Sequence, residues 1–257
     1  MTLDREGLAE LICTNIRRIV DGAETATRYR EPLVGFVAAD DLRFPDLRRV
    51  VGPAHLLPQE LLPGARAVVS FFLPFARDVV DANARHKELV AREWALAYVE
   101  TNALIGRITA QLIEILAAQE VRAVAEPATH NFDPETLESR WSHKSMAVMA
   151  GLGSFGLHQM VITDSGCAGR FGSLILDAEL VGSPRSPKER CLYFYDGSCL
   201  ECVQRCPVSA LDAVEPLDKQ RCWAHLLEVA PRHQDLGVVD ACGKCALGPC
   251  SLESAVP

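Results

Sequence analysis

The chain has 257 residues, 49% of them hydrophobic, so it can bury one large core or two modest ones and is not a disordered chain. Its formal net charge of −8 argues against a nucleic-acid partner, because a phosphate backbone would be repelled. No apolar run reaches the length of a membrane span, and Met1–Glu6 lacks a basic and then apolar leader pattern. We therefore expect a cytoplasmic protein without a membrane partner.

The first half of the chain alternates helical and strand patterns. Apolar residues recur at helical spacing over residues 3–20, and the apolar segments 32–39 and 65–73 are typical of buried strands. Residues 84–119 contain no proline and predict one long helix, or two helices with a break at Gly106. A short strand is expected at 121–125.

The second half continues the alternation until a polar segment interrupts it. Residues 133–149 predict a helix with Pro134 in its first turn, and residues 160–163 and 173–176 predict strands. The proline- and serine-rich segment 181–190 fits neither pattern. The sequence thus predicts an α/β or α+β domain over residues 1–185 and a second domain over 186–257.

Cysteines dominate the second domain. Cys13 and Cys167 are isolated, whereas eight of the ten cysteines lie close together near the end of the chain. In a reducing compartment such a cluster indicates metal binding and not disulfides. The eight candidate metal ligands are Cys191, Cys199, Cys202, Cys206, Cys222, Cys242, Cys245 and Cys250.

The cysteine spacing resembles that of bacterial ferredoxins, C-x2-C-x2-C-x3-C-P. Cys199, Cys202 and Cys206-Pro207 match its last three positions, and its first position falls on Asp196. We expect the nearby Cys191 to be the ligand instead, because thiolate is the softer donor. A Cys-x-x-Cys turn aims two sulfurs at neighbouring corners of a cubane, and a helix over residues 207–211 is expected to point Cys206 towards the other cluster.

This crossover assigns the cysteines to two [4Fe–4S] clusters. The first set is Cys191, Cys199, Cys202 and Cys250, and the second is Cys206, Cys222, Cys242 and Cys245. Zinc is the alternative, because four-thiolate zinc sites also use Cys-x-x-Cys pairs. The Cys-Pro ending and the odd cysteine between the pairs favour clusters.

A glycine-rich segment precedes the cysteines. Residues 151–156 form a literal G-x-G-x-x-G, but a helix is expected before it and a strand after it, the reverse of a dinucleotide site. A second glycine-rich stretch spans residues 166–173. The two stretches predict either a cofactor cleft, where backbone approaches a flat ligand closely, or two tight turns.

The glycine segment Ala150–Gly156, the segments 160–163 and 169–173 and the double cysteine tail together resemble the epoxyqueuosine reductases, which are related to the reductive dehalogenases. The resemblance implies an α+β architecture, with a nitroreductase-like cobalamin-binding domain before a two-cluster ferredoxin-like domain. It also implies cofactor-binding residues Gly151, Gly153, Ser154, Phe155, Gly156, Gly169, Arg170 and Gly172. The chain departs from the family pattern by lacking the lysine after Gly156 and by carrying Pro249-Cys250 in inverted order.

The resemblance implies an oxidoreductase in which two clusters pass electrons to a bound cobalamin that reduces a small substrate. Asp133 and His158 are the candidate proton donors; a helix N-cap and a hydrogen-bonded loop residue are their structural alternatives. An electron-transfer protein that docks a partner is the alternative function. The expected partners are an electron donor of the ferredoxin or flavodoxin type and a small-molecule or protein acceptor.

Overall fold

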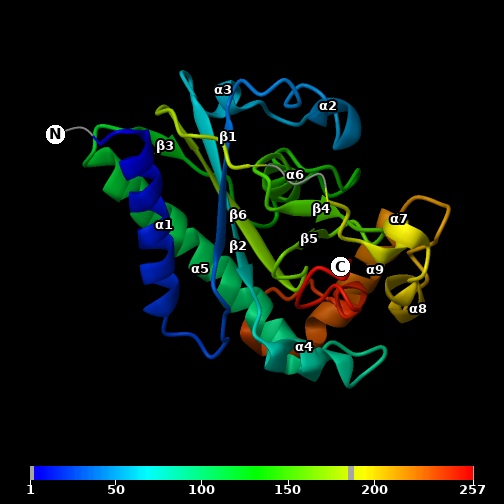
Figure 1. Cartoon of the computed structure of the whole chain (residues 1–257). Coiled ribbons are helices and arrows are strands. Elements are labelled where there is room, and N and C mark those ends of the chain that lie inside the picture. The colour runs from blue at the N-terminus through cyan, green and yellow to red at the C-terminus, as the bar shows by residue number, and fades with distance from the viewer. Residues whose placement is uncertain (1–2, 185–187, 257) are drawn as a thin grey trace.

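A four-stranded antiparallel sheet forms the centre of the computed structural model, which describes residues 3–184 and 188–256 (Figure 1). Its order is β1 (Leu33–Ala38), β2 (Ala67–Pro74), β6 (Gly169–Leu176) and β3 (Ala123–Val124). Along the long β2–β6 pair, Ala67 lies opposite Leu176 and Pro74 opposite Gly169. The architecture is therefore a mixed α/β fold.

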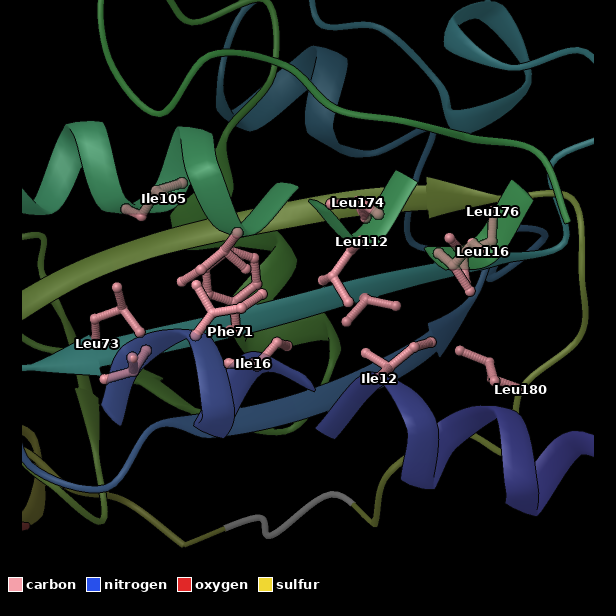
Figure 2. Packing of buried hydrophobic residues seen from close by; sticks show 14 of the residues in the cluster. Ile12, Ile16, Phe71, Leu73, Ile105, Leu112, Leu116, Leu174, Leu176 and Leu180 are labelled. Carbon is pink, nitrogen blue, oxygen red and sulfur yellow. The ribbon is translucent and has the colours of Figure 1, made fainter. Parts of the chain in front are cut away.

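Two long helices cover one face of the sheet. They are α1 (Arg5–Asp21), which Asp4 caps through the N–H of Gly7, and α5 (Arg92–Ala117). Figure 2 shows side chains of both helices meeting those of β2 and β6 in the main core. Because other elements cover the opposite face as well, all eight residues of β2 are buried.

The opposite face carries α6 (His143–Met149), the short helices α2 (Leu47–Val50) and α3 (Pro58–Leu61), and a hairpin of β4 (Gly153–Phe155) and β5 (Val161–Thr163) (Figure 1). Trp141 is fully buried there, and its indole N–H donates to Ser173 Oγ at 2.8 Å. This bond satisfies the polar atom of the largest buried side chain on that side of the sheet.

The cysteine-rich tail gathers beside one end of the sheet, near β5 and α4 (Arg77–Ala84) (Figure 1). It contains α7 (Leu192–Asp196), α8 (Glu201–Arg205), α9 (Lys219–Val229) and two 3-10 turns, η1 (Ala230–Leu236) and η2 (Lys244–Ala246). The expected boundary between residues 185 and 186 lies outside the described residues. None of the helices that the structure describes is long and apolar enough to cross a membrane.

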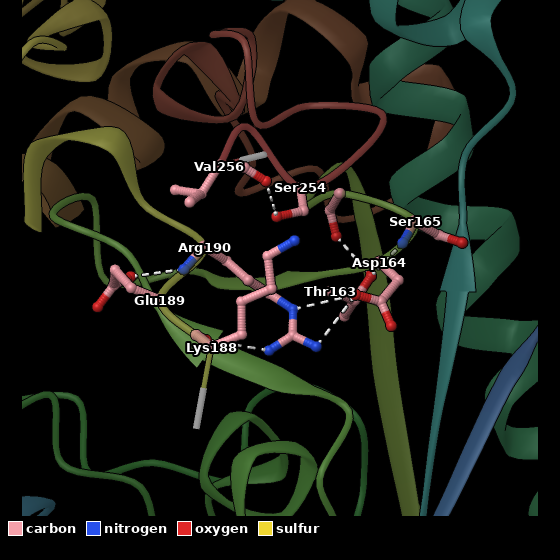
Figure 3. Close-up of polar contacts among 9 residues, drawn as sticks. Thr163, Asp164, Ser165, Lys188, Glu189, Arg190, Ser254 and Val256 are labelled. Carbon is pink, nitrogen blue, oxygen red and sulfur yellow. Dashed lines mark hydrogen bonds and ion pairs between the residues drawn. The ribbon is translucent and has the colours of Figure 1, made fainter. Parts of the chain in front are cut away.

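Two arginines tie the tail to the sheet domain. The guanidinium of Arg30 donates to the carbonyls of Phe75, Ser165 and Leu252, at 2.9, 2.6 and 2.7 Å. Arg190 is only 4% exposed, and its Nη2 donates to Asp164 Oδ1 at 3.0 Å (Figure 3). Both contacts join segments that are distant in sequence.

A buried lysine and asparagine form the third tie. Lys244 Nζ donates to the backbone oxygen of Asn83 at 2.6 Å and to its Oδ1 at 2.8 Å. Asn83 Nδ2 donates to the carbonyl of Cys242 at 2.9 Å, and its Oδ1 also accepts the N–H of Ala91 at 3.0 Å. One asparagine thus closes the α4–α5 loop and holds the cysteine segment.

The prediction of a long helix over residues 84–119 is wrong about where that helix begins. Helix α4 ends at Ala84, and α5 begins at Arg92, because the Asn83 side chain binds the N–H of Ala91 and holds the intervening turn. Gly106 does not break α5, and a Cβ at that position would meet open space.

Two further helix predictions are wrong. Residues 133–142 are not helical, because Asp133 Oδ1 accepts the N–H groups of Glu135 and Thr136 in a local turn, and α6 begins only at His143. Asp133 is therefore not an N-cap. Residues 207–211 form no helix either; instead, the N–H of Ala210 donates to Cys206 Sγ at 3.2 Å.

Replacing Asn83 by alanine should destabilise the protein by about 3 kcal/mol, because it removes one of the two acceptors of the buried Lys244 ammonium and leaves the carbonyl of Cys242 and the N–H of Ala91 without the partner that the Asn83 side chain supplies. Anaerobic urea unfolding followed by circular dichroism measures this loss. Gln111→Ala on the exposed side of α5 is the matched control and should change stability by less than about 0.5 kcal/mol. Equal unfolding midpoints for the two variants would contradict the role given to Asn83.

Candidate metal and redox site

The structure brings the eight tail thiols together in two groups of four. Around one cavity lie the side chains of the first predicted set, Cys191, Cys199, Cys202 and Cys250. A second cavity of about 300 Å³ is lined by the second set, Cys206, Cys222, Cys242 and Cys245. Cys245 lines both cavities, so the two groups are adjacent.

Short local structures set the directions of these thiols. Helix α8 carries Cys202 on its first turn and ends at Cys206, which sends the two thiols to different cavities. Gly243 adopts φ 72°, and a Cβ there would collide with the ring of Trp94. The Cys242–Cys245 turn thus requires glycine in order to pack against α5.

Burial, and then the crowding of like groups, raises the pKa of one thiol in each group, whereas hydrogen bonding with Cys167 lowers that of Cys250 to about 5. Burial first, and then the neighbouring thiols Cys250, Cys191 and Cys199, raise the pKa of Cys202 to about 12. In the other group, burial followed by Cys242 and Cys206 raises the pKa of Cys222 to about 11. Without metal the thiols of Cys202 and Cys222 are neutral at pH 7, and metal binding must displace their protons.

The donor sets fit two iron–sulfur clusters. Each set offers four soft sulfur ligands around one cavity, and Cys206 already accepts a backbone N–H, the type of contact that cluster sulfurs receive. Asp196 does not line the first cavity; its exposed carboxylate accepts the N–H of Ser198 at 2.9 Å. Cys191 lines that cavity, as expected for the fourth ligand.

Two residues of the sheet domain contact Cys250. His158 Nε2 lies 3.4 Å from Cys250 Sγ, and the buried thiol of Cys167 lies 3.9 Å from the same sulfur. Together the three side chains form a compact group of metal-binding atoms. His158 was expected as a proton donor, whereas Cys167 was not selected from the sequence, because an isolated cysteine gives no spacing signal.

Asp133, the other expected proton donor, lines neither cysteine cavity. It is exposed, and its carboxylate is occupied by two backbone N–H groups that lower its pKa. A local turn thus explains this aspartate.

The glycines expected to cradle a cofactor pack against the chain itself. At four of these positions an added Cβ would lie closer than 3.0 Å to atoms of neighbouring strands or rings. They are Gly153, Gly156, Gly169 and Gly172. Gly169 and Gly172 belong to β6 and not to a loop. Packing against the chain thus explains why these positions carry no side chain, while Gly169 and Arg170 also line open cavities.

Two basic residues stand between the second cavity and a neighbouring one of about 260 Å³. Arg170 and Lys144 line both. Arg170 stacks on Tyr98, with its Cζ 4.4 Å from the ring centroid, and its buried Nε has no hydrogen-bond partner among the described residues. Lys144 Nζ donates once, to the carbonyl of Gln159 at 2.9 Å. Both groups can donate further hydrogen bonds.

Comparisons with known proteins identify one group of similar enzymes. No family model matches the chain. An epoxyqueuosine reductase of Bacillus anthracis is 24% identical over 177 residues, which is 66% of this chain and 42% of the relative. Another, of Xanthomonas campestris pv. campestris, is 30% identical over 180 residues, 68% of this chain and 47% of the relative. The chain is therefore similar to the epoxyqueuosine reductases over about two thirds of its length.

Solved structures show the same fold at low identity. A selenomethionine-labelled epoxyqueuosine reductase gives a TM-score of 0.63 at 19% identity, covering 96% of this chain and 66% of its own. The catabolic reductive dehalogenase NpRdhA gives 0.58 at 13% identity, covering 97% of this chain and 37% of its own. The chain spans less than half the length of the two curated relatives. The solved structures show that the chain shares the fold of both groups of proteins.

The raised thiol pKa values predict a pH dependence for the metal-free, reduced protein. Thiols of the unfolded chain ionise near the ordinary value of 9.0, whereas those of Cys202 and Cys222 keep their protons to higher pH. The folded state therefore binds more protons above pH 9, and the free energy of unfolding should fall between about pH 9 and pH 11. Urea unfolding across this range measures the slope. A Cys202→Ser/Cys222→Ser variant should give a shallower slope, and an unchanged slope would contradict the assignment.

Proposed function

We propose that the protein is an iron–sulfur oxidoreductase that holds two [4Fe–4S] clusters and delivers electrons to an acceptor beside the second one. The observation that carries this proposal is the meeting of the two four-thiol groups at Cys245, next to a cavity that continues past Arg170. When bound, the clusters supply one-electron transfer between an external donor and the acceptor. A donor of the ferredoxin or flavodoxin type fits that role.

The chain itself binds and orients the acceptor. Tyr98 holds the Arg170 guanidinium by stacking, and Asp240 fixes Tyr98 by accepting its hydroxyl hydrogen bond. His130 Nε2 lies 2.9 Å from the other oxygen of Asp240. Arg170 and Lys144 thus present two cationic donors to the cavity, which suits an acceptor that carries a carboxylate or a similar small anion.

An electron carrier without its own reaction is the second candidate. Its support is the set of exposed aromatic side chains on α7, where Phe194 and Tyr195 are 50% and 58% exposed beside the first thiol group. Such a surface could dock a protein acceptor. The cavity at Arg170 and Lys144 favours the oxidoreductase, because a carrier needs no small-molecule site.

Relatives suggest two further substrate types and a third cofactor. One solved epoxyqueuosine reductase holds a modified tRNA stem loop, and a reductive dehalogenase holds 3-bromo-4-hydroxybenzoic acid. The net charge of −8 supports the small acid over tRNA for this chain. Another dehalogenase is described as B12-dependent. A corrinoid would be held in the neighbouring cavities that Gly169, Arg170 and Lys144 line, and we assign no step to it.

The anaerobically purified protein should contain about eight irons and about eight sulfides per chain, since each cubane has four of each. Cys202→Ala and Cys222→Ala should each lose one cluster's iron, because they remove a ligand from different groups. Cys13→Ala on α1 is the matched control and should keep both clusters. Metal analysis and EPR spectra measure these contents. Zinc in place of iron would contradict the proposal.

Binding of 3-bromo-4-hydroxybenzoate, compared with its neutral methyl ester, tests the acceptor site. We expect the carboxylate to bind more tightly, and Arg170→Met to weaken its binding about 10- to 100-fold, as for the loss of a charged hydrogen bond. Arg107→Met on the exposed side of α5 is the control. Titration calorimetry measures both affinities. Equal affinities of acid and ester, or an equal effect of the two variants, would show that Arg170 does not bind an anion.

A further inference from the structure

The hydrogen bonds of His158 fix the position of its ring proton. Its Nδ1 lies 3.1 Å from the backbone nitrogen of Met160. Because a backbone N–H can only donate, Nδ1 must accept, and the neutral ring carries its proton on Nε2. That nitrogen lies 3.4 Å from Cys250 Sγ. The only N–H of this ring therefore donates to a cluster-ligand sulfur.

Cys167 approaches the same sulfur from the turn between β5 and β6. Its backbone N–H donates to the carbonyl of Cys250 at 2.9 Å, which holds the two residues side by side, and its Sγ lies 3.9 Å from Cys250 Sγ. The Cys167 side chain is fully buried against this sulfur. Because a cluster ligand is a thiolate and carries no hydrogen, a hydrogen bond between the two sulfurs must have the Cys167 thiol as its donor.

This double donation distinguishes Cys250 from the other predicted ligands. In residues 3–184 and 188–256, no other tail thiol receives a hydrogen bond from a side chain, and Cys206 accepts only the backbone N–H of Ala210. His158 and Cys167 both belong to the sheet domain, outside the tail that supplies the ligands.

We infer that His158 and Cys167 are positioning residues that raise the reduction potential of the first cluster. Reduction adds one electron to the cluster, and part of its charge resides on the ligand sulfurs. A hydrogen-bond donor to such a sulfur stabilises the reduced form more than the oxidised form. The inference rests on the proposed function. It also gives His158 a role other than the proton donor expected from the sequence.

Anaerobic redox titration of the complete protein, monitored by EPR, tests the inference. His158→Leu and Cys167→Ala should each move one of the two potentials to a more negative value and leave the other unchanged. His158→Asn and Cys167→Ser retain a donor group and should restore part of the shift. Cys13→Ala is the matched control and should move neither potential. The potential of the second cluster serves as an internal reference in every variant.

The iron–sulfur stretching frequencies in resonance Raman spectra give a second measurement. Loss of a donor to Cys250 should raise an Fe–S(Cys) stretching frequency, because the sulfur bonds the iron more strongly. Unshifted potentials in His158→Leu, or equal shifts of both clusters, would overturn the inference while leaving the two-cluster proposal intact. Wild-type protein without a cluster at Cys250 would overturn both.

Discussion

The buried bonds between Asn83 and Lys244 are the constraint on which the site depends. The tail has little regular structure of its own, and the second cavity is lined partly by the tail and partly by the sheet domain. Lys244 lies between two predicted ligands, Cys242 and Cys245, and only 2% of it is exposed. A buried ammonium needs partners, so Asn83 fixes where this segment sits. The thiols are placed by contacts of residues that are not themselves ligands.

Packing between the sheet domain and the tail also explains the glycine at position 166. Gly166 adopts φ 73°, and a Cβ there would collide with the backbone at Ser251. Next to this contact, the N–H of Ala168 donates to the carbonyl of Ser251 at 3.0 Å. Close approach is what the glycine-rich sequence predicted, but the approaching surface is the tail and not a flat cofactor. A glycine pattern alone does not distinguish these two surfaces, because both require the absence of a side chain.

Regular periodicity made part of the fold predictable. The amphipathic pattern of α1 and the apolar runs of β1 and β2 predicted the correct element types. An element buried on one face has apolar residues at a regular spacing, and an element buried on both faces has a continuous apolar run. The helix expected over 133–149 was wrong because one carboxylate, that of Asp133, competes for backbone N–H groups. The grouping of the thiols followed from spacing. The contact of Cys167 with Cys250 and the stacking of Arg170 on Tyr98 needed the structure, because these partners are distant in sequence.

The two thiol groups receive different electrostatic environments from the same scaffold. Lys144, Lys244 and Arg170 line the second cavity, whereas His158 and Cys167 approach one sulfur of the first as N–H and S–H donors. A cation acts over several ångströms and stabilises negative charge anywhere on a cluster, while a neutral N–H or S–H acts only through direct contact. Lys144 and Arg170 also line the neighbouring cavity, so each would interact electrostatically with both the cluster and a bound anion. Electron delivery and acceptor binding would therefore be coupled at Arg170 and Lys144, because a reduced cluster adds negative charge close to the groups that bind the anion.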